Sequence, residues 1–160
     1  MAFSNELSLT LRLFLKTYRW RKINPTPWSP AKKPLSECKL AIGSSAGFVL
    51  PGQEPFDDGF KGGDPSYRWI PSDSKVEELI ETHRSQSFDR SGLAKDPNLG
   101  FPLDRLRALE KSGIFGELNK RHVSFMGSIT APGRFIARSA PGFAQELVED
   151  EVDVALLVPV

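Results

Sequence analysis

The sequence predicts an α/β fold, with an open, mostly parallel sheet that has helices on both faces and is incomplete at its carboxyl-terminal side. Three observations predict it. A short apolar run at 38–42 precedes a turn of small residues, a helix with start and stop signals occupies 102–113, and the run 152–160 is almost wholly apolar. Alternating strands and helices with short connections favour a parallel sheet, because parallel strands need crossover connections.

The first 37 residues are expected to form a helix and a proline-rich strap. Residues 6–20 place apolar side chains among charged ones, as in an amphipathic helix. The stretch 24–30 then contains three prolines and cannot be regular structure, because proline removes a backbone donor and disfavours helix in the preceding residue. We therefore expect two parts, 1–37 with the helix and strap, and 38–160 as a single, truncated α/β domain.

The middle of the chain combines a strand with long irregular stretches. Residues 38–42 are predicted to form a buried strand, and 43–47 a turn of small residues. The segment 51–74 is rich in glycine and proline, so we expect a long loop, and its aromatic residues indicate that it is ordered and packed. Residues 76–82 fit a strand or a helical turn equally well.

The second half has clearer signals. Pro102 occupies a first helical position, and leucines recur every three residues until Gly113 ends the predicted helix. A short strand is predicted at 122–126 and a helix at 135–148, with a break or fresh start at Pro141. The final run 152–160 is predicted to be a central parallel strand buried on both faces, with an edge strand as the alternative.

Composition excludes several classes of protein. The 160 residues are 39% hydrophobic and 26% charged with a net charge of +1, so no overall charge attracts nucleic acid or a membrane surface. No apolar stretch reaches the roughly 18 residues of a membrane span. The single cysteine excludes an internal disulfide and favours the cytoplasm. Metal-ligand spacings and the P-loop and serine-hydrolase patterns are absent from the sequence.

Small residues after the first strand are the first candidates for binding. Ser44, Ser45 and Gly47 can hold a carboxylate or phosphate with backbone amides. The alternative is a tight turn between strand and loop, because the dinucleotide-binding glycine pattern is missing.

The long aromatic loop supplies a second group of candidates. Arg68 can hold a substrate carboxylate, and Asp64 and Tyr67 lie beside it in the sequence. The alternative is loop packing with a surface arginine.

His83 and Asp89 are candidates to position or protonate a substrate, because histidine titrates near neutral pH. A loop histidine and a turn-forming aspartate are the alternative. Cys38 begins a buried strand and has no neighbouring histidine or second cysteine, so it is interpreted as a packed thiol and not a catalytic one. His122, which opens the predicted strand 122–126, is interpreted as a structural residue.

The end of the sequence is its most hydrophobic segment. In open parallel sheets the active crevice lies at the carboxyl ends of the strands. The chain is therefore expected to stop where such a fold places its reactive residue.

Many short segments together resemble the selenoprotein B family of glycine, betaine, sarcosine and D-proline reductases. They occur in the family's order and cover about three quarters of the chain. The matching segments are Ser44-Ser45-Ala46-Gly47, Pro55-Phe56, Gly63 through Pro71, His83, Phe88-Asp89, Asp96-Pro97-Asn98, Phe101 through Leu106, Ser124 through Gly127, and Asp153 through Val160.

The resemblance implies reductive cleavage of a C–N bond in a small amino acid or amine. It implies a selenocysteine or cysteine directly after Val160, so no catalytic residue is expected within the 160 residues. It also implies a partner reductase subunit that carries a pyruvoyl group, and a thiol reductant. No cofactor is expected on this chain itself.

One hypothesis is that translation was ended, in a conceptual reading, at a UGA codon for selenocysteine. The alternative function is a non-catalytic α/β module that binds or senses a small molecule. A decayed fragment without function is a third interpretation.

Overall fold

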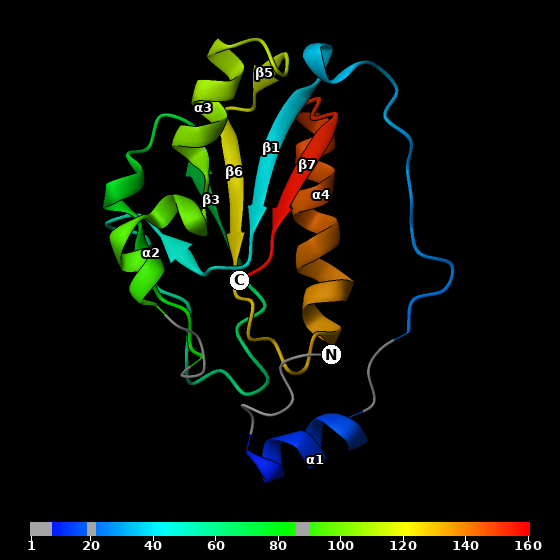
Figure 1. The fold of residues 1–160 in the computed structure, drawn as a ribbon, viewed down its shortest axis with the longest axis vertical. Coiled ribbons are helices and arrows are strands. Elements are labelled where there is room, and N and C mark those ends of the chain that lie inside the picture. Colours follow the sequence, from blue (N-terminus) through cyan, green and yellow to red (C-terminus); the bar gives the residue numbers. More distant parts are fainter. Residues whose placement is uncertain (1–7, 19–21, 86–89) are drawn as a thin grey trace. The chain divides into compact units, whose positions relative to one another are not determined.

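The computed structural model describes residues 8–18, 22–85 and 90–160. The chain divides into two compact units, residues 1–30 and 31–160 (Figure 1). The first unit contains α1 (Leu9–Thr17), which confirms a helix within the predicted range 6–20. The described residues after it, 22–30, form no helix or strand. The second unit contains the sheet.

Strand β1 is the centre of a five-stranded, mostly parallel sheet (Figure 1). On one side β7 runs parallel to it from the pair Leu40↔Val154 to the pair Ser44↔Val158. On the other side two parallel strands share its length, β5 at the beginning and β6 at the end. Strand β3 closes this side, antiparallel to β6. The bounds are β1 (Lys39–Ser44), β3 (Tyr67–Pro71), β5 (Glu117–Leu118), β6 (Arg121–Phe125) and β7 (Val154–Val158).

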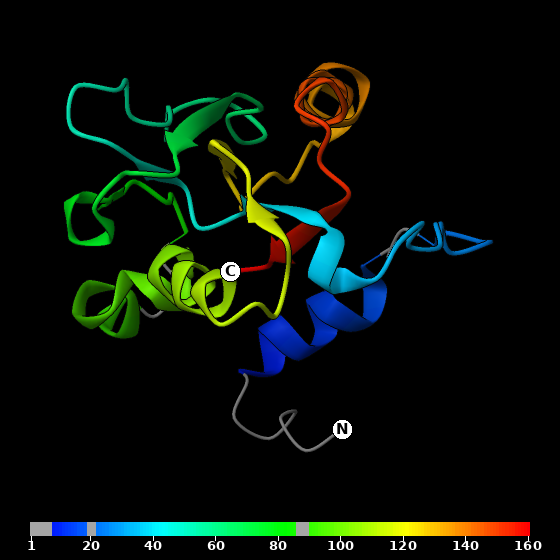
Figure 2. The ribbon, with the colours of Figure 1, turned by 90° about the horizontal axis from the view of Figure 1, so that it is seen from above.

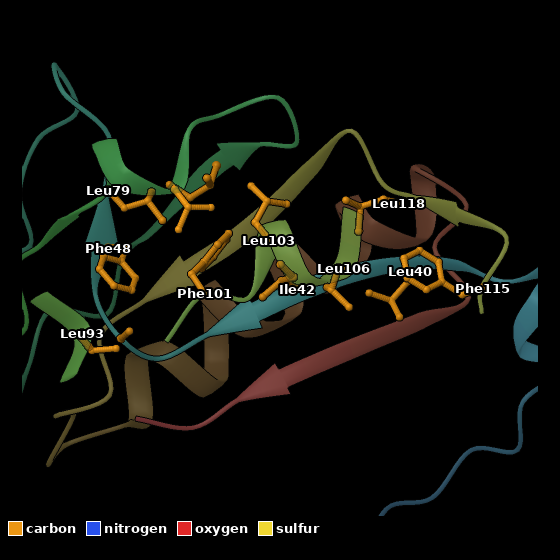
Figure 3. Packing of buried hydrophobic residues seen from close by; sticks show 13 residues of the cluster. Leu40, Ile42, Phe48, Leu79, Leu93, Phe101, Leu103, Leu106, Phe115 and Leu118 are labelled. Atoms are coloured by element: carbon orange, nitrogen blue, oxygen red, sulfur yellow. The ribbon is translucent and has the colours of Figure 1, made fainter. Parts of the chain in front are cut away.

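Helices lie on both faces of the sheet, as predicted. Figure 2 shows α3 (Leu103–Lys111) and α4 (Ala140–Glu149) on opposite sides of β1 and β6. The main core fills the α3 side, where leucines of the helix meet β1 side chains and Phe101 (Figure 3). The α4 side is aromatic, with the Phe143 ring stacked on Phe125 at a centroid distance of 5.9 Å.

The prediction that the final strand is central and buried on both faces is wrong for the described chain. Strand β7 pairs with β1 alone among the described strands. Leu156 is 38% exposed and Leu157 66% exposed. Successive side chains of a strand point to opposite faces, so apolar residues in succession need a cover on each side. No described helix buries them at this edge, and the predicted alternative, an edge strand, is what the structure has.

The predicted loop 51–74 contains β3, which the sequence analysis did not identify. Its flanking prolines and glycines resemble loop composition, yet its residues alternate between the two faces and Ile70 is fully buried. The undecided segment 76–82 contains both elements, a 3₁₀ turn at Val76–Glu78 and strand β4 (Ile80–Glu81). Strand β4 pairs antiparallel with β2 (Phe48–Val49) outside the main sheet.

The helix boundaries follow the predicted signals closely. Pro102 is the N-cap of α3, so the helix begins at Leu103, one residue later than predicted. Gly113 follows the end of the helix with a φ of +72°. The predicted helix at 135–148 begins as a π-helical turn, Phe135–Ser139, and continues as α4, with Pro141 in the first turn of α4. Short elements complete the fold, α2 (Ser91–Lys95) and a 3₁₀ turn at Pro97–Leu99. Among the described residues, no helix has the length and apolar character required to cross a bilayer.

Candidate functional site

The carboxyl ends of β1, β6 and β7 meet at one edge of the sheet (Figure 1), and the turn after β1 joins them. The amide of Ser45 donates a 3.1 Å hydrogen bond to the carbonyl of Val158, and that of Gly47 donates one of 3.1 Å to Phe125. Beyond β7, the amide of Val160 donates to Oγ of Ser45 over 2.9 Å. Open α/β sheets bind ligands at this edge, so the candidate site is here.

At the same edge, Gly127 lies close to two backbone carbonyl groups and to the His83 side chain. A Cβ atom at this position would lie 2.8 Å from the carbonyl oxygen of Val160 and 2.9 Å from that of Ser45. It would also lie 3.1 Å from Nε2 of His83. Such contacts are closer than real side chains make, so only glycine fits without a shift of backbone. The absence of a side chain here brings the His83 imidazole close to the end of β7.

His83 is held in a defined orientation. Its side chain is buried, and its Nδ1 accepts a 3.2 Å hydrogen bond from the amide of Ser85. Because Nδ1 accepts, the neutral ring carries its proton on Nε2, the nitrogen nearest Gly127. Burial lowers the pKa of His83, an effect opposed by the Glu81 carboxylate and reinforced by Arg90. The neutral ring can therefore donate a hydrogen bond from Nε2 at this edge.

A surface pocket of about 510 Å³ opens next to His83. Charged and apolar residues both line it. The lining residues are Pro55, Phe56, Asp58, Thr82, His83, Arg84 and Arg90.

The two arginines of the pocket are held differently. Arg90 forms an ion pair with Glu81 over 3.3 Å and donates to the carbonyl of His83. Arg84 donates from Nη1 to the carbonyl of Phe60 over 2.9 Å. The pocket thus contains two guanidinium groups, one of which is neutralised by a carboxylate.

Of the predicted turn residues, Ser44 points inward rather than to the edge. It is fully buried, its Oγ donates to the carbonyl of Gly100 over 2.6 Å, and it accepts from the amide of Ala46 over 3.1 Å. Ser45 and Gly47 lie at the edge itself, where their polar groups join neighbouring strands. These contacts support the tight-turn alternative for Ser44.

Tyr67 and Arg68 lie on opposite faces of β3, beside the carboxyl end of β6, where they pair with Phe125 and Ser124. The Tyr67 hydroxyl donates to Glu146 of α4 over 2.8 Å, and burial and this carboxylate raise the pKa of Tyr67. Arg68 donates to the carbonyls of Glu54 over 2.8 Å and Pro55 over 3.2 Å. Arg68 therefore holds the backbone of Pro55, which lines the pocket.

The remaining candidates are placed as follows. Asp89 lies outside the described residues. Cys38 is buried and its Sγ lies 3.3 Å from the carbonyl oxygen of Pro34, as a packed thiol would. Asp64 is buried in the long loop, where it accepts from the amides of Asp57 and Ser66. No group of three potential metal ligands occurs in the described part of the chain.

Sequence reasoning missed Gly127, Arg84 and Arg90 as residues of the site. Gly127 had a usable signal, because it follows a predicted strand directly, as the small residues 43–47 follow the first one. Arg84 and Arg90 had none beyond their proximity to His83. In the structure they share a pocket with Pro55, Phe56 and Asp58 of the long loop.

Comparison with known families matches residues 9–159 to the family described as glycine/sarcosine/betaine reductase selenoprotein B. The D-proline reductase gamma subunit of Acetoanaerobium sticklandii is 31% identical over 150 residues, which are 93% of this chain and 60% of that protein. The sarcosine reductase complex component B subunit beta of Peptoclostridium acidaminophilum is 33% identical over 134 residues, 82% of this chain and 30% of that protein.

The glycine reductase complex component B subunit gamma of Symbiobacterium thermophilum is more distant, at 25% identity over 147 residues. The chain spans 60% of the first of these relatives and about a third of the others. No solved structure matches it.

Proposed function

Because the chain belongs to the glycine/sarcosine/betaine reductase selenoprotein B family, we propose that it is part of a reductase component that reductively cleaves a C–N bond. The substrate is a small amino acid or amine. The family match over residues 9–159 carries this proposal. Two of the relatives are named as subunits of multi-component reductase complexes, so the proposal includes a partner reductase subunit and a thiol reductant.

The reactive group in this proposal is a selenol or thiol directly after Val160. Support comes from the position of that residue, which Ser45 holds at the carboxyl edge of the sheet. Nε2 of His83 and the carbonyl oxygen of Val160 both border the position that a Cβ of Gly127 would occupy. A nucleophile attached there would lie beside a hydrogen-bond donor and the 510 Å³ pocket.

The chemistry requires the selenolate or thiolate, since the ionised form is the nucleophile. It attacks the substrate α-carbon, forming a bond from carbon to selenium or sulfur while the C–N bond breaks. The amine leaves with the electron pair and takes up a proton from solvent water, while the neutral Nε2–H of His83 donates a hydrogen bond at the strand end. A reductant thiolate then attacks the selenium or sulfur and forms a bond to it, while the released carbon takes a proton from water. A second thiol of the reductant displaces the selenol or thiol and leaves the reductant as a disulfide. Because selenols and thiols persist in reducing surroundings, the proposal includes a cytoplasmic location.

Alkylation of the protein expressed from its own gene, including the codons that follow Val160, tests this. We expect iodoacetamide near neutral pH to modify a selenocysteine or cysteine at the next position, as located by peptide mass spectrometry. Cys38 is an internal control, because its buried side chain should stay unmodified in the folded protein. A residue without selenium or sulfur at that position would contradict the proposal.

The role of His83 has a separate test. His83→Gln should raise the pH midpoint of alkylation, because the variant loses the imidazole donor beside the anion. His122→Gln is the matched control, since His122 lies in the core and not at the strand ends. Equal midpoints in His83→Gln and the unmodified sequence would remove His83 from the mechanism.

A further inference from the structure

The guanidinium group of Arg84 lines the pocket and is not paired with a carboxylate of the described residues. Its Nη1 donates a hydrogen bond to the carbonyl of Phe60. No carboxylate of the described residues forms an ion pair with it, whereas Arg90 in the same pocket is paired with Glu81. A guanidinium with donors to spare matches the geometry of a carboxylate, which it can bind through two parallel hydrogen bonds.

Arg68, the arginine predicted from the sequence to bind a substrate carboxylate, already uses its guanidinium donors within the protein. Its Nε donates to the carbonyl of Glu54 over 2.8 Å, and its two terminal nitrogens donate to Ser66 over 2.8 Å and to Pro55 over 3.2 Å. The same guanidinium lies 4.6 Å from the centre of the Phe56 ring. Its donors are thus used to hold the loop 54–56, which forms one wall of the pocket.

The other lining residues restrict the kind of anion. Asp58 also lines the pocket, so a doubly charged phosphate would meet a carboxylate of like charge. A zwitterion suits the pair better, with its carboxylate toward Arg84 and its ammonium toward Asp58. Pro55 and Phe56 supply apolar surface for the remaining carbon atoms. His83 borders both this pocket and the end of β7.

We propose that Arg84 is the carboxylate-binding residue of a site for a small zwitterionic amino acid in this pocket. The inference rests on the proposed function for its connection to catalysis, because His83 joins the pocket to the strand end where the reactive group is placed. It assigns substrate recognition to this chain itself, in addition to any contribution from a partner subunit.

Nuclear magnetic resonance on the ¹⁵N-labelled 160-residue chain tests the proposal without any turnover. Acetate is the carboxylate probe, methylammonium the cation probe and methyl phosphate the competing anion. Acetate should shift the Nε–H signal of Arg84, and Arg84→Met should weaken acetate binding about tenfold or more, the effect of losing charge-assisted hydrogen bonds. Arg138→Met, at an exposed position before α4, is the matched control and should leave acetate binding unchanged.

Arg84→Lys retains the charge and loses the paired donors, so it should bind acetate with intermediate affinity. Equal acetate affinity in Arg84→Met and the unmodified chain would overturn the proposal. Tighter binding of methyl phosphate than of acetate would overturn the carboxylate assignment. Alkylation after Val160 is independent of these titrations, so failure of the carboxylate site and failure of the proposed function are distinguished.

Discussion

The backbone N–H of Ile42 in β1 donates a 3.2 Å hydrogen bond to Nδ1 of His122 in β6. This bond lies where β1 changes neighbours, because β5 pairs with it at Leu40 and β6 pairs with it only from Gly43 onward. An amide in that gap has no strand carbonyl opposite it, and a buried amide without a partner is costly. The His122 ring supplies the acceptor, which supports its predicted structural role.

Stability should fall as the pH is lowered, because His122 has to remain neutral. Burial, with a smaller effect of Arg107, lowers the pKa of His122 from 6.5 to about 4. Between about pH 6.5 and about pH 4, His122 is therefore protonated in the unfolded chain and neutral in the folded chain. The free energy of unfolding decreases as the pH is lowered through this range. The loss should be about 3 kcal/mol for His122, and His83 adds to it with the same sign. Urea unfolding across this range measures it.

His122→Gln is the control for this pH dependence. Glutamine can still accept from Ile42 but does not titrate, so the variant should be less stable at pH 7 and lose less stability on acidification. An unchanged pH slope in His122→Gln would show that other groups cause it.

Gly127→Ala should destabilise the protein by about 1–3 kcal/mol, because the added Cβ meets two backbone carbonyl oxygens that have to shift. Gly133→Ala is the matched control, since a Cβ there meets nothing within 4 Å. Its helical position should make that variant neutral or slightly more stable. Equal unfolding midpoints in urea for both variants would contradict the crowding at Gly127.

Arg121→Met should loosen α4 from the sheet. The Arg121 guanidinium contacts Asp150 over 2.7 Å and Glu146 over 2.7 Å, and lies 4.3 Å from the centre of the Trp69 ring. Losing this partly buried network should cost about 1–2 kcal/mol in urea unfolding. Arg105→Met is the control, because the ion pair between Arg105 and Asp96 is more exposed to solvent than the Arg121 network. Its loss should lower the free energy of unfolding clearly less. A larger loss in Arg105→Met would contradict the assigned role of Arg121.

Ser44→Ala separates the two interpretations of the turn after β1. If Ser44 serves the turn, the variant loses its hydrogen bonds to Gly100 and Ala46 and about 1–2 kcal/mol of stability, while acetate binding is unchanged. Calorimetric titration and urea unfolding of the same sample measure both. Reduced acetate binding with normal stability would restore the anion-cradle interpretation.

Helices and strands with strong local sequence signals were predicted correctly. Strands β1 and β6 and helices α3 and α4 were predicted because apolar period, proline and glycine mark them in the chain itself. Strand β3 was missed because Pro65 precedes it and Pro71 is its last residue, and β5 was missed because a two-residue strand has no period. The edge position of β7 was predicted only as an alternative, since an apolar run has the same composition at a centre and at an edge.

The family, the order of the main strands and helices, and the expectation of a site at the carboxyl edge of the sheet followed from the amino-acid sequence, because short motifs and periodicity are local properties. Only the tertiary structure placed His83 beside Gly127 and Val160, engaged Arg68 in the loop 54–56, and put Arg84 in the pocket. These relationships join residues far apart in the chain, and they depend on how the strands pair and how the loops pack, which no local pattern specifies.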